Sequence, residues 1–113
     1  DATIAQADLV LTGEGRIDSQ SLHGKTPVGV ARVAQHHGKP VIAIAGCLGN
    51  GAGLLHAHGI AAMFAVVHRA CTVEQALAEA ASNVRIAARN VAAALQVGMA
   101  LAQPGLPVPA RAS

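Results

Sequence analysis

The sequence predicts an α/β fold in which short parallel strands alternate with helices. Three apolar segments have the length of strands: Asp8–Gly13 (DLVLTG), Val41–Gly46 (VIAIAG) and Ala61–Val67 (AAMFAVV). None alternates regularly between polar and apolar residues, which is typical of strands buried on both faces of a parallel sheet. A helix-like segment follows each strand, and this alternation favours βαβ units with right-handed crossovers.

The first two connecting segments carry helix signals. Thr26 is placed to cap a first helix, Pro27 suits its first turn, and Gly38 is a stop signal. A second, shorter helix is expected over residues 52–58, ending at Gly59.

The third helix is expected to be long. Thr72 and Gln75 have the spacing of a capping box, in which each side chain binds the backbone of the other residue. Apolar residues then recur every three or four positions, which predicts one continuous amphipathic helix. Its apolar stripe consists of Val73, Leu77, Ala80, Val84, Ala87, Val91 and Ala94.

Composition narrows the class of protein. The 113 residues suit one domain, with residues 1–102 as its body and residues 103–113 as a flexible, proline-rich tail. The net charge of +2 and the single aromatic residue argue against nucleic-acid binding, and no apolar run has the ~20 residues of a membrane span. Two cysteines without Cys-x-x-Cys spacing, Cys47 and Cys71, are expected to be free cytosolic thiols.

The surface is expected to be partly covered by other protein. Charged residues make up only 12% of the chain, which is low for a free surface. The chain begins at Asp1 rather than Met, and three strands are few for such a sheet. These observations predict a fragment that contacts a missing part or associates with itself.

The polar loops are expected where ligands bind, at the carboxyl ends of the strands. The first, Thr12–Pro27 (TGEGRIDSQSLHGKTP), resembles two common phosphate-binding motifs but matches neither. A Walker A motif requires glycine where Ser19 stands, and a dinucleotide motif requires glycine where Asp18 stands.

The contents of this loop still suit phosphoryl transfer. Glu14 and Asp18 are candidates for holding a divalent metal or accepting a proton, and Arg16 is a candidate for binding a carboxylate. Lys25 precedes a helix and is placed to neutralise a phosphate. The alternative is a polar loop whose charges merely pair with one another.

Three further residues have two readings each. Gly49 and Asn50, in the glycine-rich segment Gly46–Gly53, suit either a backbone anion site or a flexible connector. His23 is either a ligand contact or a hydrogen-bonded loop histidine. The remaining histidines lack zinc-ligand spacing and are expected at the surface.

The segment DLVLTGEGRIDSQSLHGKTPVGVARVA resembles the type-1 glycerate kinases, and the resemblance continues through GKPVIAIAGCLG, HGIAAMFAVV and ARNVAAALQVGM. It implies a cytoplasmic kinase that phosphorylates D-glycerate using ATP and Mg²⁺. It also implies a three-layer Rossmann-like domain that is the C-terminal part of a larger two-domain enzyme. The residues that match the motif are Gly13, Glu14, Gly15, Arg16, Asp18, Gly24, Lys25 and Pro27.

The loop residues and the resemblance together give the candidate site. The catalytic candidates are Glu14, Arg16, Asp18 and Lys25, with Asp18 also the candidate metal ligand. Substrate or phosphate contacts are expected from Gly13, Gly15, His23, Gly24, Gly49 and Asn50. Two other hypotheses stay open at this point: a non-catalytic α/β binding or assembly module, and an unrelated domain that binds a sugar phosphate or acid phosphate.

Overall fold

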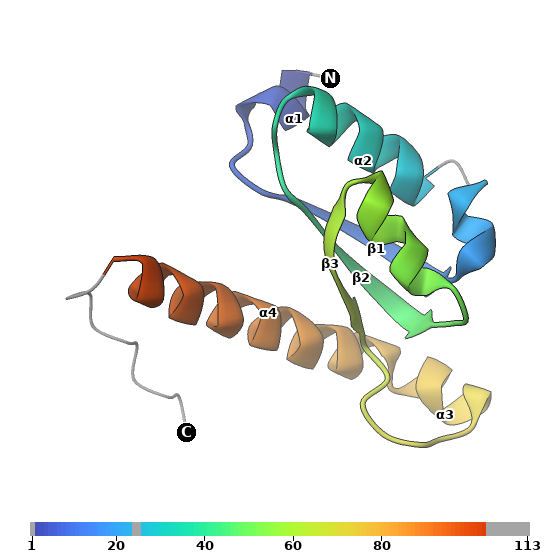
Figure 1. Cartoon of the computed structure of the whole chain (residues 1–113). Helices are drawn as coiled ribbons and strands as arrows, with labels where there is room; N and C mark the ends of the chain where they lie inside the picture. Colours follow the sequence, from blue (N-terminus) through green and yellow to red (C-terminus); the bar gives the residue numbers. More distant parts are fainter. Residues whose placement is uncertain (1, 24–25, 104–113) are drawn as a thin grey trace.

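The computed structural model describes residues 2–23 and 26–103, and within them three strands form one parallel sheet. The strands are β1 (Val10–Ile17), β2 (Val41–Leu48) and β3 (Ile60–Ala65), with β2 in the middle (Figure 1). Both neighbours run parallel to β2. The predicted α/β fold with three parallel neighbouring strands is confirmed.

The first strand is longer than predicted, and its expected end at Gly13 is wrong. Pairing with β2 continues through Glu14, opposite Ala45, and on to Ile17, opposite Leu48. The extension gains ladder hydrogen bonds to β2, so residues 12–17 of the predicted loop belong to the sheet. The candidate residues from Gly13 to Arg16 therefore lie on a strand.

The other two strands also differ slightly from their predicted bounds. β2 runs on to Leu48, two residues past the expected end, and β3 ends at Ala65 rather than Val67. At its other end, β3 begins at Ile60, and its register with β2 is irregular between Val41 and Ile42.

One face of the sheet is covered by α2 (Thr26–His36), with α1 (Ala2–Gln6) beside it and the 3₁₀ helix η2 (Ala52–His58) next to it (Figure 1). The predicted stop signals are confirmed. Gly38 and Gly59 both adopt left-handed backbone conformations, with φ of 68° and 98°. The core lies on this face and consists of Ile17, Ala31, Ala34, Val41, Ala43, Ala45, Ala52, Leu55 and Ile60.

The other side of the sheet faces α3 (Val73–Ala78) and α4 (Ala80–Ala102). The predicted capping box is confirmed, since Thr72 Oγ1 accepts from the Gln75 amide and Gln75 Oε1 accepts from the Thr72 amide. The prediction of one continuous helix is wrong, because the chain turns at Glu79. The Glu79 carboxylate binds Arg69, 2.6 Å away in the preceding loop.

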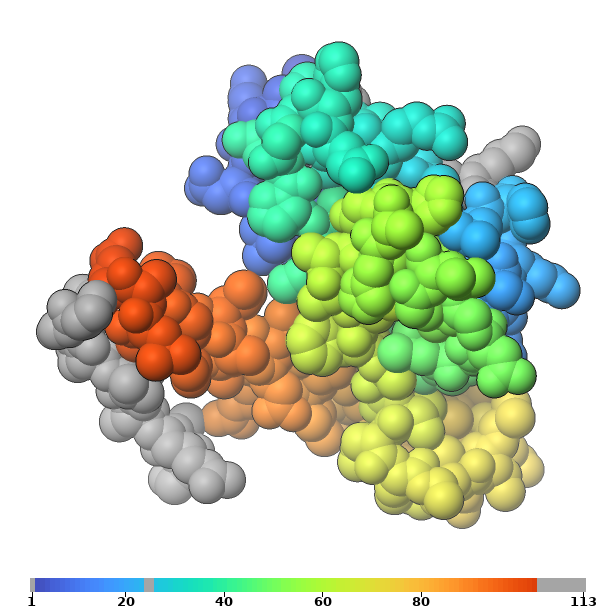
Figure 2. All heavy atoms as spheres, in the orientation of Figure 1, coloured from blue at the N-terminus to red at the C-terminus, as the bar shows by residue number. Residues whose placement is uncertain are grey.

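The apolar stripe on these helices is mostly uncovered. Val73 and Leu77 are 77% and 73% exposed, whereas Val91 is buried. Figure 2 shows α4 extending well beyond the body formed by α2 and η2. The predicted stripe is therefore largely exposed, and its contact with other protein stays a prediction. In the described residues, no helix is both long enough and apolar enough to cross a membrane.

Candidate functional site

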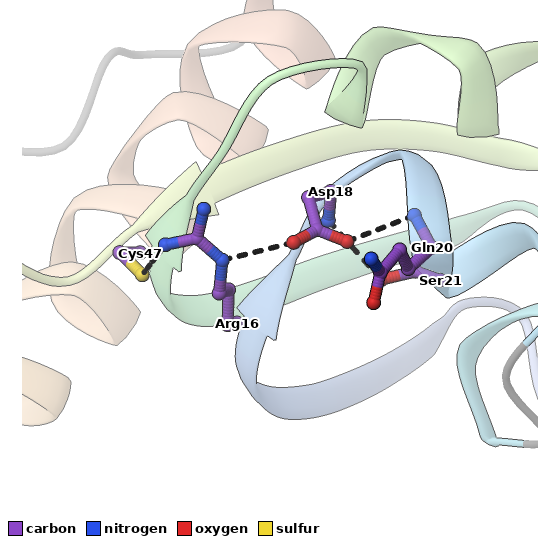
Figure 3. A network of polar contacts seen from close by, with 5 residues as sticks. All are labelled: Arg16, Asp18, Gln20, Ser21 and Cys47. Atoms are coloured by element: carbon purple, nitrogen blue, oxygen red, sulfur yellow. Dashed lines mark hydrogen bonds and ion pairs between the residues drawn. The ribbon is translucent and has the colours of Figure 1, made fainter.

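Arg16 and Asp18 form an ion pair at the end of β1. Arg16 Nε donates to Asp18 Oδ2 over 2.9 Å, and Arg16 Nη1 donates to Cys47 Sγ over 3.6 Å (Figure 3). Because side chains two apart on an extended chain share one side, Arg16 and Asp18 are positioned to meet. Cys47 comes from the carboxyl end of β2, opposite Arg16 in the strand register.

Asp18 also organises the turn after β1. Its Oδ1 accepts from the Gln20 amide over 2.9 Å, and its own amide donates to Ser21 Oγ over 3.1 Å. This capping arrangement begins the 3₁₀ helix η1 (Ser19–Leu22). Both carboxylate oxygens of Asp18 are therefore held in place, and its side chain is only 23% exposed.

The pairing affects the pKa values of both residues. The Arg16 guanidinium, helped by the Gln20 amide, lowers the pKa of Asp18. Asp18 in turn raises the pKa of Arg16, as does Cys47 to a smaller degree. Asp18 thus stays ionised, which suits an orienting or metal-binding carboxylate better than a strong base.

We expect the Asp18 carboxyl group to titrate below the ~3.9 of a free aspartate. Because the folded-state pKa is lowered, the contribution of the pair to stability is complete above the unfolded-state pKa and is lost as pH falls through the lowered value. A carbon-13 NMR titration measures this pKa directly. In Arg16→Gln it should rise towards the ordinary value, and an unchanged pKa would contradict the assigned cause.

The turns after β1 and β2 are joined through their backbones. The Gly49 amide donates to the Ile17 carbonyl over 2.7 Å, and the Ser19 amide donates to the Asn50 carbonyl over 2.9 Å. Gly51 then turns with a φ of 80° against Ser19. The Gly49 amide is engaged within the protein, so the two turns form one braced unit.

Gly51→Ala should destabilise the chain by roughly 1–3 kcal/mol, because alanine disfavours a left-handed conformation. A methyl group there would also lie 2.6 Å from Ser19 Cβ. Urea unfolding measures the loss. The matched control is Gly53→Ala, because nothing lies within 4 Å of the added carbon. Equal stability of the two variants would contradict the assigned constraint.

A cavity of about 730 Å³ opens between the sheet and helices α3 and α4. Gly13, Glu14 and Gly15 line it from β1, and Leu77 and Val84 line it from the helices. Glu14 is the one charged side chain among its lining residues. The walls are otherwise mainly apolar, so this cavity is a poor match for a phosphate group.

The remaining candidates are placed as follows. His23 is exposed at the end of η1, where its amide donates to the Gln20 carbonyl over 3.0 Å. Gly24 and Lys25 lie outside the described residues. Among the residues that are described, no three His, Cys, Asp or Glu side chains gather to hold a metal.

Cys47 is the contact that the sequence analysis missed. It is half-buried, lines the cavity and touches Arg16. The signal that identifies it is the strand register, because Arg16 and Cys47 are partners once β1 and β2 are extended past their predicted ends.

The chain is similar to known kinases over most of its length. Residues 1–96 match the model of the glycerate kinase family. The chain is 52% identical to glycerate 2-kinase of Escherichia coli K12 over 96 residues, covering 85% of this chain and 25% of the relative. It is 44% identical to glycerate kinase of Bacillus subtilis 168 over 97 residues, covering 86% and 25%.

A solved structure agrees with the sequence relatives. A crystal structure provisionally named glycerate kinase 2, from Salmonella typhimurium LT2, is 55% identical with a TM-score of 0.62. The match covers 87% of this chain and 24% of that one. The chain thus spans about a quarter of the length of these relatives and aligns with their C-terminal portion. With residues 1–96 matched by the family model, this chain belongs to the glycerate kinase family.

Proposed function

We propose that this chain supplies part of the active site of a glycerate kinase, which transfers the γ-phosphoryl group of ATP to D-glycerate in the cytoplasm. The observation that carries the proposal is the family match, which includes the charged residues at the end of β1. The relatives named glycerate kinase give the acceptor, and the kinase class gives the nucleotide donor.

The charged residues have separate roles in this proposal. Arg16 binds the carboxylate of glycerate, since a guanidinium matches a carboxylate in shape and charge. Asp18 orients the reacting hydroxyl or a metal ion, and Glu14, which lies on β1, supplies a second carboxylate. Lys25, which directly precedes α2 in the sequence, neutralises charge on the phosphates. Phosphoryl transfer mainly needs such positioning and charge stabilisation.

The described residues fit magnesium only as a partial site. Asp18 offers one ionised carboxylate, and no three acidic, histidine or cysteine side chains gather in the described part of the chain. Mg²⁺ is commonly held by one or two carboxylates together with phosphate oxygens and water. When bound with ATP, it would neutralise charge on the phosphates, with Asp18 as its ligand from this chain.

The smaller residues shape the space around the reacting groups. Gly13 and Gly15 present bare backbone on β1 next to the cavity. His23 and Gly24 stand between η1 and α2 in the sequence, next to the proposed phosphate site, and Asn50 belongs to the braced turns. The glycines keep side chains away from the substrate, and His23 and Asn50 are the proposed contacts to substrate or phosphate.

A chimera tests this function directly. The matched segment of the Escherichia coli glycerate 2-kinase is replaced by this chain, which is 52% identical to it. ADP release with D-glycerate is then measured in a coupled assay, beside the isolated chain. We expect activity from the chimera, because the segment would complete the active site. A folded chimera that releases no ADP with D-glycerate would contradict the proposal.

The exposed apolar surface is also part of the proposal. The cavity walls include Leu11, Val73 and Leu77, each more than half exposed. The relatives are about four times as long as this chain, so much protein is available to cover that surface. We assign the surface to contact with the remaining part of the same polypeptide.

Two measurements test that contact: the melting temperature of substituted chimeras, and sedimentation of the isolated chain to detect dimers. Leu77→Asp should lower the melting temperature of the chimera but leave the isolated chain unaffected, since Leu77 is 73% exposed there. Exposed Ala78→Asp is a control on the same helix. Stable dimers of the isolated chain that Leu77→Asp dissociates would instead identify the surface as a self-association site.

A further inference from the structure

The Arg16 guanidinium lies in a socket formed by Asp18, Cys47 and Gly49. Asp18 binds its Nε and Cys47 binds its Nη1, from opposite sides (Figure 3). Gly49 closes the third side. A carbon added to Gly49 would lie closest to Arg16 Nη2, and then 2.9 Å from Arg16 Cζ and 3.1 Å from Asp18 Cβ. The socket therefore requires glycine at this position for the guanidinium to keep its place.

The guanidinium is held without being covered. The Arg16 side chain is 60% exposed, and Nη2, the nitrogen nearest Gly49, carries none of the contacts drawn in Figure 3. A guanidinium has several N–H donors in one plane, so anchoring two nitrogens leaves donors directed elsewhere. Holding such a group in advance reduces the ordering cost of binding an anion.

The braced turns explain why the socket is rigid. Gly49 is fixed by the hydrogen bond from its amide to the Ile17 carbonyl, and Asp18 is fixed by its bonds with Gln20 and Ser21. Cys47 is part of β2. Each wall of the socket thus belongs to a strand or a capped turn, which is what precise positioning of a binding group requires.

We infer that this socket positions Arg16 to bind the carboxylate of the acid substrate, with Cys47 and Gly49 as positioning residues beside the bound acid. The inference rests on the proposed function for the identity of the acid. It assigns Gly49 a role through the space it leaves, rather than through its amide, which already binds Ile17. It also places Cys47 Sγ next to the bound carboxylate.

Gly49→Ala is a selective test of the socket. Its backbone conformation is one that alanine adopts, and the nearest atoms belong to the far end of a flexible arginine. The variant should fold normally while the guanidinium moves aside. Gly53→Ala adds the same methyl group in open space and serves as the control.

In the chimera, Gly49→Ala should raise KM for D-glycerate roughly tenfold or more, the scale of a weakened hydrogen bond to a charged group. Because the carboxylate is bound equally in ground and transition states, kcat and KM for ATP should stay within about threefold. Cys47→Ala should act in the same direction, and Cys47→Ser should restore part of the loss. An unchanged KM in Gly49→Ala would overturn the inference.

A second readout does not depend on turnover. In the chimera, D-glycerate should slow the alkylation of Cys47 by iodoacetamide. Glycerol, which lacks the carboxylate, should not slow it. Cys71, also free and half-buried, is the internal control. Protection of Cys47 without ADP release would support the socket and contradict the proposed kinase activity. Activity without protection and with unchanged KM would overturn the socket alone.

Discussion

Asp18→Asn should lower kcat for glycerate phosphorylation by roughly 10²–10³-fold in the active chimera, the scale of losing one electrostatic group at a reacting centre. The substitution keeps the shape of the side chain and an oxygen for the Gln20 amide. It removes the negative charge that pairs with Arg16 and that a metal or hydroxyl would contact. The substitution should therefore lower kcat more than it lowers the stability of the fold.

Ser21→Ala separates the two effects. Ser21 Oγ accepts from the Asp18 amide, so its loss weakens the same capped turn without changing any charge. We expect a lower melting temperature for Ser21→Ala with kcat within about threefold of the parent. If Asp18→Asn behaves in the same way, the charged residues form a network that stabilises the turn and takes no part in transfer.

The sequence was a good guide to the fold where apolar patterning is strong. All three strands and the stop signals at Gly38 and Gly59 could be predicted, because burial on both faces and left-handed glycines leave clear patterns. The extent of β1 could not. Gly13 and Gly15 resemble a loop because glycine disfavours strands, yet here Gly15 packs so closely on Gly46 that a side chain on Gly46 would collide with it.

The sequence predicts which residues form the apolar stripe on α3 and α4, but it does not predict that most of them are exposed. Periodicity indicates which side chains share a face of a helix, and it does not indicate what covers that face. Val73 and Leu77 follow the pattern of a buried stripe and are nevertheless exposed, because nothing within the described residues packs over them. The turn at Glu79 was missed because Glu79 is a good helix former that here binds Arg69.

The candidate site was predictable in its local part only. Arg16 and Asp18 lie two residues apart, so their meeting follows from an extended backbone. The contact with Cys47 depends on the register of two strands 31 residues apart in the chain, which local patterns do not define. The glycine-rich turn suggested an anion site, whereas the amide of Gly49 binds the Ile17 carbonyl.

Lys25→Met should lower kcat by roughly 10²–10³-fold in the active chimera, because it removes the positive charge that we propose stabilises the transferring phosphoryl group. Lys25 lies outside the described residues, and the expectation rests on its place in the sequence directly before α2. The start of an α-helix attracts anions through its free amides and its dipole. Methionine keeps much of the length and apolar stem of lysine, so the fold should tolerate the change.

Lys39→Met is the matched control, because it removes the same charge after α2 rather than before it. Lys39 is separated from the start of β2 by one proline, so it lies at the amino end of the sheet. Ligands bind at the opposite edge, at the carboxyl ends of parallel strands. A general effect of net charge would lower kcat in both variants alike. Selective loss in Lys25→Met, with equal melting temperatures, would assign the charge to phosphoryl transfer, and kcat within about threefold of the parent would remove Lys25 from the proposed site.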